Sequence, residues 1–141
     1  LPFIGYDAGD YLSHWIAMGK RIDEAKLPKI FYVNWFRRDD DGSFLWPGYG
    51  ENSRVLKYVV DRLEGNVEAV ETAIGFVPAE GSLDVDGLNL TPEQIQKALT
   101  VDPAEWESEI IQITEWFEKL GPKLPAVLWS ELEDLKARLK A

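Results

Sequence analysis

The stretch TPEQIQKALTVDPAEWESEIIQITEWFEKLGPKLP, residues 91–125, predicts two consecutive helices. Thr91 and Asp102 are good N-cap residues, because their side-chain oxygens can accept a hydrogen bond from a free backbone amide of the first helical turn. Each is followed by a proline, Pro92 and Pro103, which suits the first helical position because its missing N–H has no helical partner there. We therefore expect one helix to begin at each proline.

The first of these helices is expected to end near Thr100 and the second at Gly121, since glycine favours the position just past a helix. In the second helix, apolar side chains recur every three or four residues, which is typical of an amphipathic helix. They are Trp106, Ile110, Ile113, Phe117 and Leu120. Pro125 opens a last predicted helix with a similar apolar set, namely Leu128, Leu132, Leu135 and Leu139.

Two more helices are predicted in the front half of the chain, because apolar residues again recur at helical spacing. Their predicted bounds are Asp7 to about Ile22 and Asn52 to about Glu64. We expect Lys20 and Arg21 in the last turn of the first, where cations suit the helix dipole. Gly65 is expected to close the second. The apolar residues on one face of the second are Val55, Leu56, Val59, Val60 and Leu63.

Strand-like segments lie between these helices. Residues 30–36, IFYVNWF, are rich in β-branched and aromatic side chains, which predicts a buried strand. Shorter strand pieces are predicted at residues 67–73 and 75–77, and residues 81–90 are expected to be extended. The sequence therefore predicts an α+β fold, with short strands and aromatic loops in the front half and amphipathic helices in the back half.

The composition argues against several classes of partner. The chain has 15 Lys plus Arg against 25 Asp plus Glu, which gives a formal net charge of -10. A surface of this sign is unsuited to the phosphate backbone of nucleic acids and to anionic membranes. No apolar stretch approaches the ~18 residues of a membrane-spanning helix. The absence of cysteine removes disulfides and thiol catalysis and fits our expectation of a cytoplasmic protein.

The sequence lacks the common catalytic motifs. It has no Gly-x-x-x-x-Gly-Lys-Ser/Thr phosphate loop. It has one histidine, His14, and a lone histidine on a predicted helix is far more often structural than a metal ligand. The run Asp39-Asp40-Asp41-Gly42 is similar to the start of a calcium loop, but further oxygen ligands do not follow at the required spacing. We interpret it as part of a polar turn over residues 37–43.

Residues 34–52 are the remaining candidate for a functional site. Aromatic side chains alternate here with glycine and proline, and loops seldom hold so many aromatics unless these pack on a core or on a ligand. Flat rings on two sides can stack a purine, at about 1–3 kcal/mol per stacked base. The side-chain amide of Asn52 can read the base edge by hydrogen bonding. The residues by themselves leave an aromatic mini-core open as the alternative.

The same segment resembles the nucleotide segment of GTP-dependent phosphoenolpyruvate carboxykinases. The resemblance is carried by residues 31–37, FYVNWFR, and by residues 42–56, GSFLWPGYGENSRVL. Residues 2–6, 9–15 and 27–30 are similar to the segments that precede these in the family, whereas Asp7 and Ala8 depart from it. The match thins afterwards, although residues 74–78, IGFVP, still resemble the family.

The resemblance implies a guanine site. Family members interconvert oxaloacetate and phosphoenolpyruvate, with release of CO2 and conversion of GTP to GDP, and they use Mn or Mg ions. The residues that the resemblance assigns to guanine are Trp35, Phe36, Phe44, Tyr49, Gly50, Glu51 and Asn52. In this assignment Phe36 and Phe44 pack on the two faces of the base, and Asn52 forms a hydrogen bond with its edge.

The resemblance also implies what this chain does not supply. Residues 1–141 would form part of the C-terminal nucleotide-binding domain, with residues 1–65 as the guanine-subsite segment and residues 66–141 as a packing segment. In the family, the phosphate loop, the metal ligands and the substrate arginines precede the matching segments. We therefore expect oxaloacetate or phosphoenolpyruvate and the metal to bind outside this chain, no catalytic residue within it, no activity of the isolated chain, and a monomeric parent enzyme. The alternatives are a stand-alone binding module and a structural α+β domain whose aromatics form its core.

Overall fold

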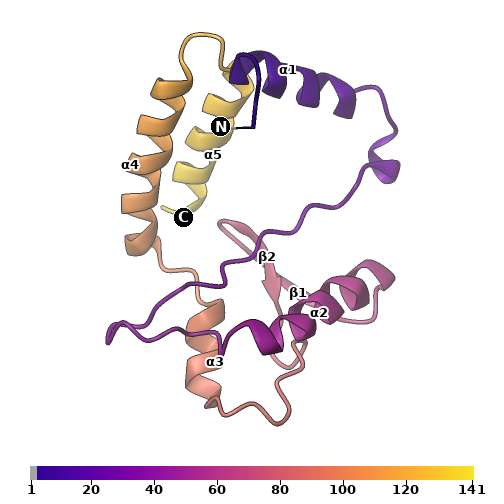
Figure 1. The fold of residues 1–141 in the computed structure, drawn as a ribbon, viewed down its shortest axis with the longest axis vertical. Coiled ribbons are helices and arrows are strands. Elements are labelled where there is room, and N and C mark those ends of the chain that lie inside the picture. The colour runs from indigo at the N-terminus through magenta and orange to yellow at the C-terminus, as the bar shows by residue number, and fades with distance from the viewer. Residues whose placement is uncertain (1–2) are drawn as a thin grey trace. The chain divides into compact units, whose positions relative to one another are not determined.

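The structure is a computed structural model that describes residues 3–141 and contains five α-helices, two short 3₁₀ helices and one β-hairpin in that range (Figure 1). These elements divide between two units. One unit consists of the described residues up to Lys29 together with Asp102–Ala141, and the other consists of Ile30–Val101. The candidate segment, residues 34–52, lies wholly in the second unit. Pro2, where the resemblance begins, lies outside the described residues.

The first unit is helical. Its elements are α1 (Ala8–Gly19), η1 (Glu24–Lys26), α4 (Pro103–Leu120) and α5 (Ala126–Arg138). The predicted N-caps are confirmed, because the Asp7 carboxylate accepts from the Gly9 N–H at 2.8 Å and the Asp102 carboxylate accepts from the Ala104 N–H at 2.9 Å. The predicted end of α4 at Gly121 is also confirmed.

The core of the first unit lies along α4 and α5. Leu132 of α5 is only 3% exposed, and Leu124 just before the helix is also buried. Phe117 of α4 meets Trp129 of α5 edge-to-face, with ring centroids 5.3 Å apart. The helix α1 approaches the α4–α5 connection closely, since a Cβ on Gly9 would clash with the carbonyl oxygen of Lys123. Only glycine fits at this contact.

The predicted end of the first helix is wrong by three residues. Helix α1 ends at Gly19, and no basic residue lies in its last turn, so Lys20 and Arg21 fall just beyond the helix. Glycine is a poor helix former, which weakens the helix at this point. The carboxylate of Asp23 then accepts from the Ala25 N–H at 3.2 Å and starts the 3₁₀ turn η1, so the chain changes direction before Ile22 can extend α1.

The second unit combines helices with the hairpin. Its elements are η2 (Tyr49–Glu51), α2 (Asn52–Glu64), β1 (Ala69–Thr72), β2 (Gly75–Pro78) and α3 (Pro92–Leu99). The two strands pair antiparallel, with Val70 opposite Val77, which confirms the predicted strand pieces. Thr91 and Gln94 form a reciprocal capping box at the start of α3, and Gly65 ends α2 in a left-handed conformation with φ 77°, both as expected.

The predicted buried strand at residues 30–36 is wrong. The segment has no regular structure, and Tyr32 is 94% exposed. A strand needs a neighbouring backbone to pair with, and within residues 3–141 the pairing is limited to the hairpin and one isolated bridge between Arg38 and Phe44. The side chain of Asn34 also accepts from the Phe36 N–H at 3.0 Å, and such a local turn competes with strand pairing.

Residues 81–90 are also not extended as expected. Gly81 and Gly87 adopt φ of 76° and 75°, which reverses the chain direction at both points. The turns are closed by hydrogen bonds from the Ser82 N–H to the Ala79 carbonyl and from the Leu88 N–H to the Val85 carbonyl, each 3.0 Å long. The weak alternation of apolar and polar residues in this segment therefore reflects a loop with two turns.

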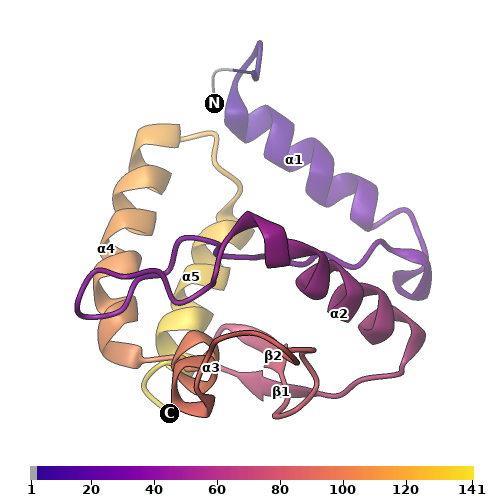
Figure 2. The ribbon, with the colours of Figure 1, turned by 60° about the horizontal axis from the view of Figure 1, so that its bottom comes forward.

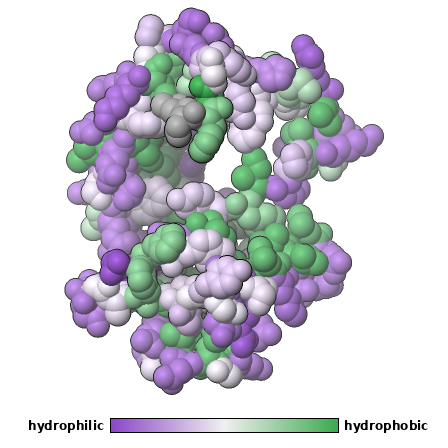
Figure 3. Space-filling view, viewed as in Figure 1, coloured by the Kyte–Doolittle hydropathy of each residue, from purple (hydrophilic) through white to green (hydrophobic). Residues whose placement is uncertain are grey.

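Part of the apolar face of α2 lies at the surface. Tyr58, which the predicted face does not include, is buried, and its hydroxyl donates to the Glu68 carbonyl at 3.4 Å. Three of the predicted apolar residues on the helix, Leu56, Val60 and Leu63, are exposed instead. Figure 3 shows hydrophobic surface in the region of α2, the helix that carries these three exposed side chains. The helix therefore packs on the side centred on Tyr58, because that side faces the start of the hairpin.

Candidate functional site

A short turn brings the two predicted stacking residues together. The Leu45 N–H donates to the Arg37 carbonyl at 3.0 Å, and the Asp39 N–H donates to the Ser43 carbonyl at 2.8 Å. Gly42, with φ 82°, allows the chain to reverse between them. The predicted polar turn over residues 37–43 is therefore confirmed. Because Phe36 precedes the turn and Phe44 follows it, their side chains meet at its base.

Phe36 and Phe44 contact each other and solvent. Their ring centroids are 6.1 Å apart, and the ring planes are inclined by 62° in an edge-to-face arrangement. Phe36 is 73% exposed and Phe44 is 50% exposed. The guanidinium of Arg38 lies 4.1 Å from the centroid of the Phe44 ring, where a cation is attracted to the aromatic face. The pair therefore offers accessible aromatic surface held at the base of a hydrogen-bonded turn.

Trp35, Trp46 and Asn52 form a second contact set in the same segment. The two indole rings lie 6.5 Å apart between centroids and are tilted by 47°. The indole N–H of Trp46 donates to the side-chain oxygen of Asn52 at 2.9 Å. All three residues are half-buried. Four of the seven predicted guanine residues thus lie in two contact sets. Phe36 and Phe44 contact each other, and Trp35 and Asn52 both contact Trp46.

The other three predicted residues, Tyr49, Gly50 and Glu51, form η2. Gly48 adopts φ 123° before this turn, and Tyr49 projects into solvent with 92% exposure. The Glu51 carboxylate pairs with the guanidinium of Arg54 at 2.7 Å. Within the described residues Tyr49 makes no ring contact, so the structure does not bring it against the Phe36–Phe44 pair.

The turn is attached to helix α3, which lies about 60 positions further along the sequence. Arg37 donates to the Ala98 carbonyl at 3.2 Å and to the Thr100 carbonyl at 2.7 Å, at the C-terminal end of α3. Lys97 pairs with Asp39 and, at 2.7 Å, with Asp40. The turn runs beside α3 in Figure 1, and Figure 2 shows the same two elements from another side. These contacts also give a structural role to two residues of the acidic run 39–41, since Asp39 and Asp40 bind the side chain of Lys97.

The Lys97 contact changes the acidity of Asp39. The hydrogen bond from the Lys97 ammonium, helped by one from the Asp40 N–H, holds the pKa of the Asp39 carboxyl below its ordinary value of 3.8. The charged carboxylate is thus favoured in the folded state. The stabilisation from this contact is present above pH 3.8 and is lost as the pH falls through the lowered pKa.

We expect the carboxyl ¹³C resonance of Asp39 to titrate below pH 3.8, and its midpoint to rise towards that value in Lys97→Met. The reason is that methionine keeps the length of the side chain but removes the ammonium. Lys136→Met is a matched control, because Lys136 pairs with Glu133 of α5 and has no contact with Asp39. An Asp39 midpoint that is the same in the parent chain and in Lys97→Met contradicts the proposed cause of the shift.

Sequence reasoning missed the residues that hold the site in place. Arg37 and Lys97 are separated by 60 positions, and nothing in either local pattern indicates that they attach the same turn to the same helix. The hydrogen bond between Trp46 and Asn52 was also not expected. It had a local signal, however, because an indole donor and an amide acceptor lie six residues apart across a Pro-Gly turn.

Other places in the structure offer less chemistry. Among residues 3–141, no group of three or more His, Asp or Glu side chains is arranged to hold a metal ion. In the same range, no helix combines the length and the apolar character needed to cross a membrane.

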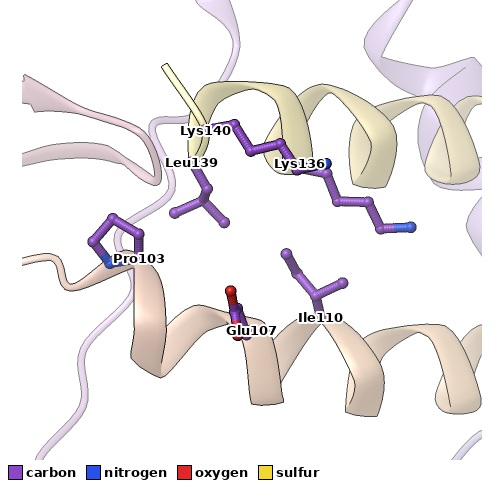
Figure 4. A pocket seen from close by; sticks show the side chains of 6 residues that line it. All are labelled: Pro103, Glu107, Ile110, Lys136, Leu139 and Lys140. Atoms are coloured by element: carbon purple, nitrogen blue, oxygen red, sulfur yellow. The ribbon is translucent and has the colours of Figure 1, made fainter.

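The first unit has an open hollow between α4 and α5, where Ile110 and Leu139 point towards one another (Figure 4). Lys136, Lys140 and Glu107 also line this hollow.

Comparison with known proteins defines the class of this chain. The family described as the phosphoenolpyruvate carboxykinase C-terminal P-loop domain matches residues 1–138, and the chain belongs to this family. The α+β architecture and the sequence resemblance are both consistent with this membership. The sequence has no Gly-x-x-x-x-Gly-Lys-Ser/Thr motif.

The similar proteins are phosphoenolpyruvate carboxykinases [GTP]. The chain is 57% identical over 139 residues to the enzyme of Paenarthrobacter aurescens and 58% identical over 139 residues to that of Renibacterium salmoninarum. It is 52% identical over 142 residues to the enzyme of Neocallimastix frontalis. These alignments cover 99%, 99% and 100% of this chain but 23% of each relative. The chain thus spans about a quarter of the length of the proteins that it matches.

Proposed function

We propose that this chain provides the guanine-binding wall of a GTP-dependent phosphoenolpyruvate carboxykinase. The complete enzyme would convert oxaloacetate and GTP to phosphoenolpyruvate, GDP and CO2. The observation that carries this proposal is the exposed pair of rings, Phe36 and Phe44, at the base of a turn that is fixed to α3. In an aromatic mini-core these rings would be buried, whereas they are 73% and 50% exposed.

The two phenyl rings bind the faces of the base in this proposal. They contact each other edge-to-face in the structure, so a base that lies between them requires one ring to turn aside. Phe36 is the more exposed of the two and is the ring that we expect to move. Phe44 stays in place, because the Arg38 guanidinium covers its ring and the bridge to Arg38 fixes its backbone. Tyr49 would complete the pocket from η2.

Hydrogen bonds at the edge of the base select guanine. Stacking by itself favours no particular purine, since every base has an aromatic face. Donors and acceptors at the edge distinguish guanine from adenine, and the amide of Asn52 stands at the start of α2 with the backbone of η2 beside it. The carboxylate of Glu51 pairs with Arg54, so we assign Glu51 to holding η2 in shape.

The rest of the reaction needs groups that we expect in the remainder of the enzyme. Phosphoryl transfer depends on positioning the nucleotide and on neutralising charge with metal ions and cationic side chains. The Mn or Mg site, the phosphate loop and the oxaloacetate or phosphoenolpyruvate site belong to that remainder in our proposal. The isolated chain is therefore expected to bind guanine nucleotide without turnover. The cytoplasmic location and the monomeric state of the parent enzyme stay predictions from the sequence.

Titration of the isolated chain with GDP and, separately, with ADP tests the proposal. Trp35 and Trp46 lie in the candidate site, so binding should change tryptophan emission. We expect a saturable change that occurs at lower concentration with GDP than with ADP. N-acetyltryptophanamide, titrated in parallel, corrects for absorption of light by the nucleotides. A chain that responds to neither nucleotide, or equally to both, would overturn the proposal that these 141 residues carry the guanine-selecting wall.

A further inference from the structure

The hydrogen bond between Trp46 and Asn52 fixes which atoms of the Asn52 amide are available to a ligand. The indole nitrogen is 2.9 Å from the side-chain oxygen of Asn52. An indole N–H can only donate, so the amide atom that faces it must be the oxygen. The Asn52 NH2 group then points away from the indole. Among residues 3–141, the structure shows no hydrogen-bond acceptor for this NH2 group.

Both partners of this hydrogen bond are held in position by their surroundings. The backbone N–H of Asn52 donates to the Tyr49 carbonyl, and the residue is the first of α2. Trp46 follows the buried Leu45 and lies against the ring of Trp35. Rotation of the Asn52 amide by half a turn would place its NH2 group against the indole N–H, where two donors meet and neither is satisfied. The amide is thus held with one orientation.

We propose that Trp46 is a positioning residue that sets the preference for guanine by holding Asn52 as a hydrogen-bond donor. This inference rests on the proposed guanine site. Guanine carries an acceptor oxygen at position 6, whereas adenine carries a donor amino group there. The NH2 group of Asn52 can donate a hydrogen bond to the oxygen of guanine, but it cannot form one with the amino group of adenine, because both groups are donors. A site built around a fixed donor rejects a ligand that places a second donor against it, since both groups then stay unsatisfied.

Two ligands that differ at the critical edge provide the test. GDP and 2,6-diaminopurine riboside diphosphate share the 2-amino group, the ribose and the diphosphate. Position 6 is an acceptor in the first and a donor in the second, and ring nitrogen 1 changes from donor to acceptor, so the change of the ratio in a variant of Trp46 or Asn52 is the measure of their role. Calorimetric titration gives the ratio of their dissociation constants. We expect the parent chain to prefer GDP by about tenfold or more, which corresponds to one well-made or mismatched hydrogen bond.

Trp46→Phe should reduce this ratio about fivefold, because phenylalanine keeps an aromatic ring but has no N–H to hold the Asn52 oxygen. Trp116→Phe, at a part-exposed position of α4 in the other unit, is the matched control and should leave the ratio unchanged. Circular dichroism of each variant establishes that it is folded.

Asn52→Asp is a second variant, and we expect it to remove or reverse the preference of the parent chain for GDP. A carboxylate has only acceptors, so it can still accept from Trp46 but cannot donate to the oxygen at position 6. We expect this variant to bind the 2,6-diaminopurine nucleotide at least as tightly as GDP. Repulsion between the new carboxylate and the diphosphate affects both ligands equally and cancels in the ratio.

The outcomes separate this inference from the proposed function. A parent chain that fails to bind GDP overturns the guanine site, and the role of Trp46 falls with it. A parent chain that binds GDP selectively and keeps the same ratio in Trp46→Phe overturns only the role of Trp46. An equal loss of selectivity in Trp46→Phe and in Trp116→Phe also overturns it, because the effect would then not depend on the indole that contacts Asn52.

Discussion

Phe44→Ala is expected to weaken GDP binding by roughly 5-fold to 150-fold, because one aromatic platform under a base contributes about 1–3 kcal/mol. Its effect on folding should be small. The ring is 50% exposed and its main neighbours are Phe36 and the Arg38 guanidinium, so we expect a loss of about 1 kcal/mol in the free energy of unfolding. Calorimetric titration with GDP and urea denaturation measure the two effects separately.

Phe76→Ala is the matched control for this prediction. Phe76 is also an exposed phenylalanine of the second unit, but it lies in β2 and outside the candidate segment. Its replacement should leave the dissociation constant of GDP unchanged. If Phe44→Ala destabilises the chain by several kcal/mol and keeps its affinity for GDP, the aromatic segment is a structural core and the stacking role is wrong.

Leu45→Ala, at the next position, should mainly reduce the stability of the second unit and leave the affinity for GDP unchanged. Leu45 is 4% exposed and is one of the few buried hydrophobic residues of the second unit, along with Tyr58. Truncation of a buried leucine removes its transfer free energy and leaves a cavity, and this typically costs about 2–5 kcal/mol. We expect a loss of about 3 kcal/mol in the free energy of unfolding of this unit. Urea titration followed through its backbone amide resonances measures the change.

Leu56→Ala is the control for the loss at Leu45. Leu56 is exposed on α2, and substitutions at exposed positions usually change stability by less than about 0.5 kcal/mol. Similar losses at both positions would show that Leu45 has no special place in the core of the second unit. Loss of GDP affinity in Leu45→Ala is expected only at urea concentrations that unfold the unit, since the leucine itself does not face the proposed ligand.

The contrast between Phe44 and Leu45 follows from the geometry of the turn. Extended residues alternate between the two sides of the backbone, so neighbours point in opposite directions. Phe44 lies in the bridge with Arg38, and the backbone N–H of Leu45 donates to the Arg37 carbonyl. One side of the segment therefore carries the exposed ring of Phe44, and the other side packs Leu45 into the second unit.

Local signals in the sequence were sufficient for most of the helices and for the hairpin. Thr91 with Gln94, Asp102 before Pro103, and Gly65 after α2 act on backbone groups within a few residues of themselves, so their effects do not depend on distant parts of the chain. The same locality explains why the polar turn at residues 37–43 was predicted. Family membership also follows from the sequence alone, because it rests on the order of residues.

Tertiary structure decided the features that depend on a distant partner. Residues 30–36 have the composition of a strand, but strand formation requires pairing with a second backbone, and within residues 3–141 this segment pairs with none. The buried side of α2 is set by the hairpin that meets Tyr58, and the turn that carries Phe44 is held by Arg37 and Lys97 through contacts with residues about 60 positions away. The sequence by itself thus determined the elements with local caps and the residues proposed to meet guanine. Only the tertiary structure decided which of those side chains are exposed and how they are held, because burial and long-range hydrogen bonds depend on which segments meet in space.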